Sequence, residues 1–459
     1  MNTERKSAKA LIPMLVFIIL YLLTGLVLQA SGAEMAFYQL PPPVAAFVGI
    51  IVAFIIFKGS IEQKADTFIE GCGDSNIIIM CLIYLLAGAF STLAKASGGV
   101  ESVVGIGLSL VPVRFLTGGV FLISSFLSLA TGSSVGAITA LGPIAIGLSS
   151  TGGTNPAMML GALVGGAMFG DNLSIISDTN IAATRTQKID MKDKFKLNIR
   201  MALPSAIITF FLFLFLAKPD GPPQISNISY NIVDILPYVF VFIAALAGVN
   251  VLVVLTGGVF FSTILLLTKT SFDLLNAGQL IWEGFTGMFE IFLLSMFIGG
   301  LSHMVEKEGG INWIISKIEK SIKSKRSAEV GIITLVSIAD IAVANNTVAI
   351  IISGPIAKNM CSKYKIDPRR SASLLDTFAC IFQGIIPYSA QVLIAAGFTN
   401  GAVCPLDIMP YLWYQFILLI FAVISVYIPY ANPKGEWDYE KDLPKDSANS
   451  QKNLQANNL

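Results

Sequence analysis

The sequence predicts an all-α, multi-pass membrane protein made of two inverted repeats, each with about five transmembrane helices and one re-entrant hairpin. Three observations predict this fold class. Hydrophobic residues make up 54% of the 459-residue chain and charged residues only 13%, whereas soluble domains carry about 25% charged residues. Long apolar runs recur along the chain, and short motifs of the first half return in the second. The predicted domains are an N-terminal segment (1–10), a first repeat (11–217), a linker (218–232), a second repeat (233–430) and a tail (431–459).

The predicted membrane spans are apolar runs, most of them near the roughly 20 residues that a helix needs to cross a bilayer. Two longer stretches, 116–145 and 329–357, are interrupted in the middle by glycine, serine or asparagine. We predict a re-entrant hairpin for each of them, so that broken helices meet near the midplane. The ten predicted spans are 11–28, 44–57, 76–96, 157–184, 201–217, 233–247, 251–268, 276–302, 371–396 and 409–430.

Lysine and arginine gather in three loops, 185–200, 317–326 and 358–370. The positive-inside rule therefore places these loops in the cytoplasm, together with both termini. We expect an extracytoplasmic linker at 218–232 and a disordered cytoplasmic tail at 431–459, in the cytoplasmic (inner) membrane of a bacterium. The loops without lysine or arginine, which we place outside, are 31–43, 146–156 and 397–408.

An internal duplication relates the two halves. The motif Gly-Pro-Ile-Ala at 142–145 returns at 354–357, an offset of 212 residues, and at this offset Ser133–Ser134 aligns with Asn345–Asn346. The loop after the first motif is uncharged, whereas the loop after the second motif is basic. Equivalent loops therefore lie on opposite sides of the membrane, which an odd number of crossings in each half requires. Inverted repeats with broken helices are typical of secondary transporters.

The composition also excludes several classes of protein. A net charge of +1 argues against a nucleic-acid partner. The chain has one histidine, His303, outside any HExxH motif, no CxxC pair among its five cysteines, and no GxxxxGK[ST] loop. An intramembrane aspartyl protease would need Gly-x-Gly-Asp, but Met168 occupies the place of the first glycine before Asp171. We therefore expect no enzyme and no cofactor, only transported Na⁺ or H⁺.

Polar and ionisable residues interrupt several predicted spans. An ionisable side chain in a span costs about 2.5–3.5 kcal/mol on insertion scales and is a functional candidate by default. Asp171 and Asp178 lie seven residues apart in the run 157–184, where an unwound helix would also offer carbonyl oxygens. Hard cations prefer oxygen ligands, so Asp171, Asp178 and Asp376 are the predicted Na⁺ ligands. The candidate ion- or substrate-binding residues are Asp171, Asn172, Ser174, Ser177, Asp178, Thr179, Asp376, Gln383, Ser389, Asp340, Asn345, Asn346, Thr347, Ser133 and Ser134.

Each acidic candidate also has a purely structural interpretation. Asp178 would cap a helix that begins just after it. Asp376 would pair with Arg369 or Arg370 near the membrane surface. Asp340 would accept hydrogen bonds from backbone donors at the tip of the second hairpin.

Two transport functions follow from buried carboxylates. Burial favours the neutral form of a carboxyl group, while a cation in the same pocket favours the ionised form, so that H⁺ and Na⁺ compete. Placed between two rocking repeats, such a group predicts cation/proton antiport. The alternative is Na⁺- or H⁺-coupled transport or exchange of an amino acid or small organic anion, with the hairpin tips as donors to its carboxylate. The expected partners are the lipid bilayer and these solutes, and a homodimer stays open.

The run Phe-Gly-Asp-Asn-Leu-Ser-Ile-Ile-Ser-Asp-Thr at 169–179 resembles a signature of the NhaC family of bacterial Na⁺/H⁺ antiporters, approximately F-G-D-K-[LM]-S-P-[LI]-S-D-T. The stretches 375–377 and 386–389 resemble its second signature, roughly E-D-[ST]-G followed by L-I-P-W-N. The resemblance covers residues 10–430. It implies an inner-membrane secondary transporter that couples ions through Asp171, Asp178 and Asp376, with relatives that exchange organic acids or import amino acids.

The sequence departs from these signatures at several positions. Asn172 stands where many members have lysine, Ile175 replaces proline and Leu375 replaces glutamate. Tyr388 and Ser389 replace Trp-Asn. Because the loss of a lysine and a glutamate alters the charge of the pocket, these departures favour the amino-acid alternative.

Overall fold

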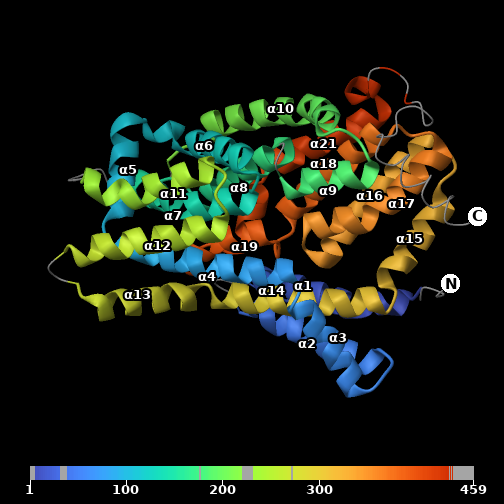
Figure 1. Ribbon diagram of the computed structural model, residues 1–459, viewed down its shortest axis with the longest axis horizontal. Helices are drawn as coiled ribbons and strands as arrows, with labels where there is room; N and C mark the ends of the chain where they lie inside the picture. Colours follow the sequence, from blue (N-terminus) through green and yellow to red (C-terminus); the bar gives the residue numbers. More distant parts are fainter. Residues whose placement is uncertain are drawn as a thin grey trace, which may run out of the picture.

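The computed structural model describes residues 6–31, 39–174, 177–219, 231–269 and 272–433, with residues 435 and 437. Within these ranges the regular elements are helices, as predicted, apart from one isolated bridge between Thr154 and Pro219 (Figure 1). Residues 1–5, most of the predicted linker 218–232 and the greater part of the predicted disordered tail 431–459 lie outside the described residues.

Each of the ten predicted spans contains one helix or two. Eight segments among the described residues are long and apolar enough to cross a membrane, by length and composition. In the first half the helices are α1 (Ile12–Ala30), α2 (Pro42–Ile56), α4 (Ser75–Ala96), α8 (Pro156–Leu173) followed by α9 (Asp178–Gln187), and α10 (Met191–Leu216). In the second half they are α11 (Leu236–Leu246), α12 (Val251–Leu267), α13 (Leu274–Gly287) followed by α14 (Phe289–Lys307), α18 (Pro368–Ile385) followed by α19 (Ala390–Gly397), and α21 (Trp413–Tyr427).

The two long broken spans begin in the same way. Asn155 caps α8 by accepting a hydrogen bond from the Met158 amide at 3.1 Å, and Pro156 is the first helical residue. Asp367 and Pro368 repeat this start at α18. Proline fits the first turn because its fixed φ suits a helix and its missing N–H would have no intrahelical partner.

Three helices that the sequence analysis did not predict connect the spans. They are α3 (Ile61–Cys72), α5 (Gly99–Leu110) and α15 (Gly310–Ser321). Figure 1 shows α5 at one end of the long axis of the molecule and α15 at the other. Because α5 and α15 occupy equivalent places in the two halves, their positions agree with an inverted relation.

Both predicted re-entrant hairpins are present. The first consists of α6 (Leu116–Thr131) and α7 (Ser134–Gly152), and the second of α16 (Lys325–Val343) and α17 (Asn346–Tyr364). Their tips turn at Gly132 (φ +69°) and at Ala344 (φ +51°), which lie in the left-handed region. A Cβ on Gly152 would lie 3.0 Å from Leu116, so the first hairpin enters and leaves at the same end of the molecule.

The packing between the halves is reciprocal. Helix α3 of the first half packs on α14, and its equivalent α13 packs on α4. The short helix α9 packs on the hairpin helix α17, and its equivalent α19 packs on α7. Each half therefore contributes to both sides of the protein core, and the inverted-repeat prediction is confirmed.

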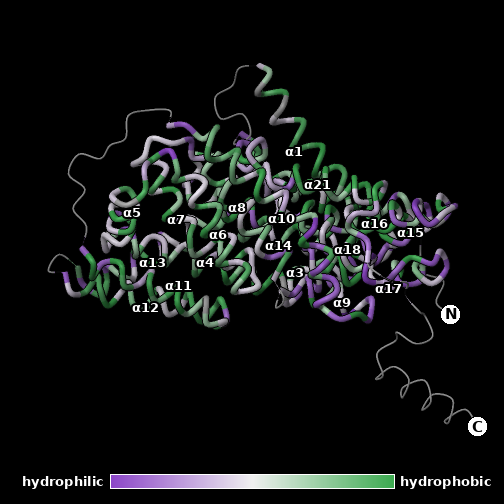
Figure 2. The backbone as a smooth tube through the Cα atoms, turned by 90° about the horizontal axis from the view of Figure 1, so that it is seen from above, coloured by the Kyte–Doolittle hydropathy of each residue, from purple (hydrophilic) through white to green (hydrophobic). Residues whose placement is uncertain are grey.

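The loops that carry lysine and arginine lie at one end of the molecule. Arg200 donates to the Asn432 carbonyl at 2.9 Å, and Arg369 donates to the Gly435 carbonyl at 3.3 Å. Figure 2 shows hydrophilic segments concentrated at this end, near α9, α15 and α17. The uncharged loop 146–156 belongs to the other end, where Thr154 bridges to Pro219.

Candidate functional site

Four helix breaks meet around one cavity of about 200 Å³. Two are the hairpin tips, and the other two separate α8 from α9 and α18 from α19. Each break presents the carbonyl groups of a helix C-terminus and the amide groups of a helix N-terminus. The lining residues are Ile79, Met80, Ile83, Gly132, Ser133, Ser134, Val135, Asp171, Ser177, Asp178, Thr179, Asn345, Asn346, Thr347, Gln383, Ala390 and Gln391. Ten of the fifteen predicted site residues are therefore brought together here.

Asp171 lies buried at the end of α8 and is held by neutral donors. Ser177 donates to Oδ1 at 2.5 Å and Ser134 donates to Oδ2 at 2.8 Å. The ion pairs among the described residues do not include Asp171. The Asn180 amide donates to the backbone carbonyls of Asp171 and Ser174 and so braces the break from α9. Because hydroxyl groups are neutral and can rotate, this carboxyl group can accept either a proton or a cation.

Asp376 is also buried, but a cation already neutralises it. The Lys194 ammonium lies 2.5 Å from Oδ2 of Asp376, and the lysine side chain is only 1% exposed. The amides of Asn198 and Asn172 donate to the same oxygen at 2.8 and 3.0 Å. Lys194 lies in the first turn of α10, so the ion pair connects the two halves of the chain.

The predicted pairing of Asp376 with a neighbouring arginine does not occur. Arg369 pairs with Asp367 at 2.6 Å, and Arg370 lies 3.4 Å from Glu329. Lys194 was missed in the sequence because it falls in the basic run 185–200, which reads as a cytoplasmic loop. Its position just before an apolar run, within reach of a buried carboxylate, was the available signal.

A chain of hydrogen bonds links Asp171 to the second hairpin. Gln391 donates to Ser134 at 3.1 Å and accepts from Gln383 at 2.8 Å. Gln383 also donates to the Ala344 carbonyl at the hairpin tip, at 3.2 Å. Gln391 was not predicted, because a lone glutamine in an apolar helix carries no charge signal. Through these side chains the state of Asp171 can be transmitted to both hairpins.

Several other predicted residues have structural roles at helix starts. Ser133, Asn345 and Ser389 accept backbone hydrogen bonds at the N-termini of α7, α17 and α19. Asn346 accepts from the Thr347 amide at 3.0 Å. Such caps satisfy amides that the helix leaves without a partner. The polar pattern at these positions therefore serves the breaks as well as the cavity.

Asp178, Thr179 and Asp340 complete the predicted set. Asp178 is exposed at the start of α9, where Ser177 is the N-cap residue, and Thr179 lies 2.7 Å from the Ser177 hydroxyl. Asp340 is fully buried in α16, and neither of its carboxyl oxygens has a hydrogen-bond partner. Among the described residues, no three acidic, histidine or cysteine side chains gather as a metal cluster. A cation would therefore be bound largely by hydroxyl and carbonyl oxygens.

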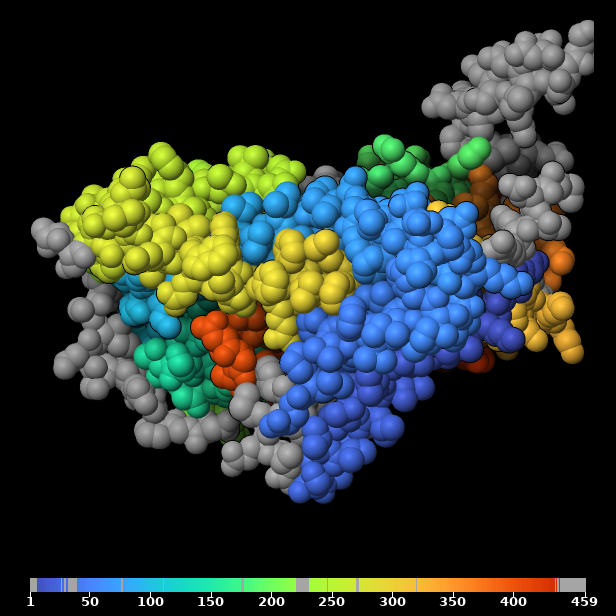
Figure 3. Space-filling model, turned by 90° about the horizontal axis from the view of Figure 1, so that it is seen from below, coloured from blue at the N-terminus to red at the C-terminus, as the bar shows by residue number. Residues whose placement is uncertain are grey.

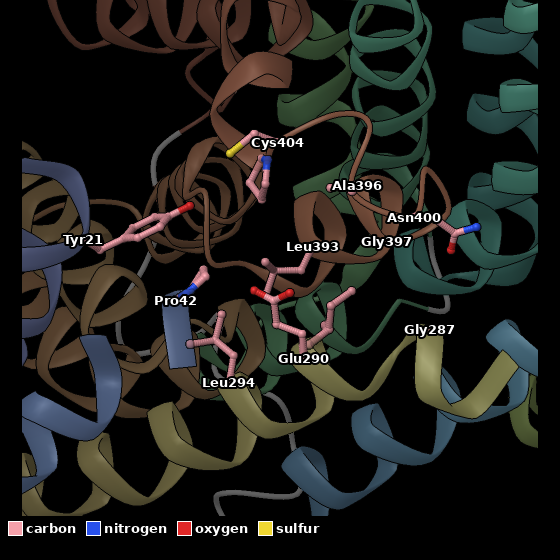
Figure 4. A pocket seen from close by; sticks show the side chains of 13 residues that line it. Tyr21, Pro42, Gly287, Glu290, Leu294, Leu393, Ala396, Gly397, Asn400 and Cys404 are labelled. Atoms are coloured by element: carbon pink, nitrogen blue, oxygen red, sulfur yellow. The ribbon is translucent and has the colours of Figure 1, made fainter. Parts of the chain in front are cut away.

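A second cavity, of about 350 Å³, lies where α1, α2, α14 and α19 meet. In Figure 3 the α19–α20 region (orange-red, with α20 at Pro405–Ile408) is recessed between α13–α14 (yellow) and the N-terminal helices (blue). Figure 4 shows the Glu290 carboxylate pointing into the cavity beside Leu393. Glu290 is the only charged residue in its described lining, which also includes Tyr21 and Cys404. The smaller cavity around Asp171 is the candidate site, because it contains the convergent polar groups.

Two inverted repeats whose broken helices meet at buried carboxylates define a secondary transporter. The chain is a multi-pass membrane protein of this class. It belongs to the Na⁺/H⁺ antiporter family, whose sequence profile matches residues 4–218 and 227–431. These two segments coincide closely with the two repeats.

Similar proteins of known name share low identity over most of their length. The malate-2H⁺/Na⁺-lactate antiporter of Bacillus subtilis is 23% identical, over 90% of this chain and 94% of that protein. The Na⁺/H⁺ antiporter NhaC of the same organism is 24% identical, over 78% and 84%. The arginine/ornithine antiporter ArcD of Halobacterium salinarum is 23% identical, over 96% and 95%. The Alcanivorax borkumensis YdaH transporter structure aligns with a TM-score of 0.41 at 13% identity, covering 94% of this chain and all of that one.

Proposed function

We propose that this chain exchanges Na⁺ for H⁺ by alternating access, with Asp171 as the carboxyl group that binds either ion. The observation that carries the proposal is the difference between the two buried aspartates. Asp376 already has the Lys194 ammonium as its counter-ion, whereas Asp171 has only the hydroxyl groups of Ser134 and Ser177. A cation and a proton can therefore replace one another at Asp171 without breaking an ion pair.

The chemistry of exchange follows from desolvation. An ionised carboxylate inside a protein is unfavourable unless a cation or a set of donors stabilises it. Bound Na⁺ supplies that charge, and bound H⁺ removes the need for it. Oxygen ligands for Na⁺ are at hand in Asp171, in the hydroxyls of Ser134 and Ser177, and in the carbonyl groups at the break between α8 and α9. Asp178, exposed on the cavity wall, attracts cations to the site.

A second candidate is exchange of a small organic solute with the coupling ion. A cavity of about 200 Å³ is far larger than a dehydrated Na⁺ requires, and α7, α9, α17 and α19 all begin at its wall. Helix N-termini favour carboxylate groups. The names of the malate/lactate and arginine/ornithine antiporters among the relatives support this candidate. No lysine or arginine is among the described residues lining the cavity, which favours a zwitterion or cation over a free anion.

We further place the protein in the cytoplasmic membrane of a bacterium, with the basic loops and both termini in the cytoplasm. The linker 218–232 then lies outside. The positive-inside rule supports this orientation, because the loops rich in lysine and arginine share one end of the molecule.

Ion flux in inside-out vesicles tests the antiport. Na⁺ added alone should dissipate an imposed pH gradient with the wild-type protein and have no effect with Asp171→Asn. Asp193→Asn, which removes an exposed aspartate paired with Lys196, is the matched control and should transport like the wild type. Wild-type rates in Asp171→Asn would contradict the assignment of the site. Coupled flux that requires an organic solute would establish the second candidate instead.

A further inference from the structure

Asp340 is a buried carboxyl group that the antiport at Asp171 does not use. Its side chain is inaccessible to solvent, and both oxygens lack a hydrogen-bond partner. The ion pairs among the described residues do not include it. An isolated ionised carboxylate in such a place is prohibitively unfavourable. In this conformation the group is therefore a neutral acid.

The first repeat shows what this position needs for packing alone. At the offset of 212 residues Asp340 corresponds to Ser128, whose hydroxyl donates to the Ala167 carbonyl at 2.6 Å. A serine is thus sufficient in one hairpin, where a titratable group takes its place in the other. The facing residues also differ, because Gly166 and Gly170 of α8 correspond to Phe378 and Phe382 of α18. Asp340 is therefore not explained by the fold that the repeats share.

Asp340 lies one helical turn before the tip of a hairpin that borders the site. The Tyr388 hydroxyl donates to the Ile341 carbonyl at 2.8 Å, and the Ser302 hydroxyl of α14 donates to the Ala342 carbonyl at 2.6 Å. These contacts hold the end of α16 in place. The tip carbonyl of Ala344 is joined through Gln383, Gln391 and Ser134 to Asp171. Movement of the hairpin is thus coupled to the state of the exchange site.

The ionisable groups on the neighbouring elements leave Asp340 without a counter-charge. Tyr388, between α18 and α19, faces it with a neutral hydroxyl. On α18, Asp376 is paired with Lys194, and Arg370 is paired with Glu329 near the other end of α16. A proton is accordingly the one partner that the closed hairpin offers.

We propose that Asp340 is a second proton-carrying residue, protonated while the α16–α17 hairpin is closed and deprotonated to water when the hairpin opens. The proposal rests on the antiport at Asp171. An O–H bond forms at Asp340 with a proton from water on one side of the membrane, and the bond breaks to return that proton to water on the other side. Each transport cycle then moves one H⁺ more than the exchange at Asp171 alone.

The H⁺:Na⁺ coupling ratio in proteoliposomes tests the proposal. The ratio is obtained from the Na⁺ gradient that just balances an imposed pH gradient and membrane potential. Asp340→Asn, and Asp340→Ser, which copies the residue of the first repeat, should each lower the ratio by one proton. Ser128→Ala removes a hydrogen bond at the equivalent position without removing a titratable group, and should keep the wild-type ratio. An unchanged ratio in either Asp340 variant would overturn the proposal.

Infrared difference spectroscopy provides a reading that does not depend on transport. The wild-type protein should show the carbonyl stretch of a neutral carboxyl group, and Asp340→Asn should lose it. Retention of that band in a folded Asp340→Asn protein would overturn the proposal even if the variant does not transport. Failure of the antiport assignment is distinguishable, because it appears as Na⁺-dependent flux in Asp171→Asn and leaves the Asp340 band unaffected.

Discussion

At the scale of single residues, symmetric positions carry different chemistry. The offset of 212 residues aligns Asp171 with Gln383, so one broken helix holds a carboxyl group where the other holds an amide. Ser177 and Ser389 remain identical at this offset, but Ser177 bonds to Asp171 whereas Ser389 caps α19. A symmetric scaffold thus supports one principal ion-binding carboxyl group rather than two.

The buried pair of Lys194 and Asp376 leads to a prediction about stability. Removing one partner of a buried ion pair costs about 3–5 kcal/mol, because it leaves the other charge uncompensated. We expect Lys194→Met and Asp376→Asn each to lower the thermal unfolding temperature in detergent, whereas Asp171→Asn, bonded only to hydroxyl groups, should not. The double variant Lys194→Met/Asp376→Leu removes both charges and should regain most of the loss. A wild-type unfolding temperature for Lys194→Met would show that the ion pair does not form.

Much of the site was predictable because polar residues interrupt apolar runs. The segments around Asp171 and Asn345 were identified in this way, and the structure places both at the same cavity. Lys194 and Gln391 were not identified. Their importance comes from partners 182 and 257 residues away, and a single sequence carries no sign of such contacts.

At the scale of elements, close helix packing distinguishes the first hairpin from the second. Gly166 and Gly170 face α6, and a Cβ on either would overlap α6 backbone or side-chain atoms. The equivalent residues of α18 are phenylalanines. The first hairpin is therefore fixed tightly against α8, and the second rests on bulky side chains, which suits the more mobile role we assign to it.

Glycine replacements test this packing. We expect Gly170→Ala to destabilise the protein by about 1–3 kcal/mol, the usual cost of overpacking, since its Cβ would lie 2.7 Å from that of Ser128. Gly119→Ala in α6 is the matched control, because no atom lies within 4 Å of its new Cβ. Alanine also favours the helix by up to about 1 kcal/mol there. Equal unfolding temperatures for the two variants, measured side by side, would rule out tight packing at Gly170.

Element boundaries were less predictable than element identity. The run 276–302 reads as one span, but it is divided at Met288 into α13 and α14. No proline or polar cluster marks that division. The hairpin tips, by contrast, are marked by polar residues beside Gly132 and Ala344, and the structure turns there.

At the scale of the whole molecule, the inverted relation makes the outward and inward routes to the site structurally equivalent. Reciprocal packing of α3 on α14 and of α13 on α4 gives each half the same environment on opposite sides. Exchanging these two environments by a small movement would open the cavity to the other side. The repeat was visible in the sequence because the motif Gly-Pro-Ile-Ala and the alternation of basic loops were both retained.

Opposite placement of equivalent residues is directly testable with thiol chemistry. Ser150 and Ser362 are equivalent at the offset of 212 residues, and both are exposed near the ends of α7 and α17. The five native cysteines are buried and free, so their background labelling should be low. A membrane-impermeant maleimide should label Ser150→Cys only from outside the cell and Ser362→Cys only in inside-out vesicles. Labelling of both variants from one side would be incompatible with two inverted halves in one membrane, and with alternating access between them.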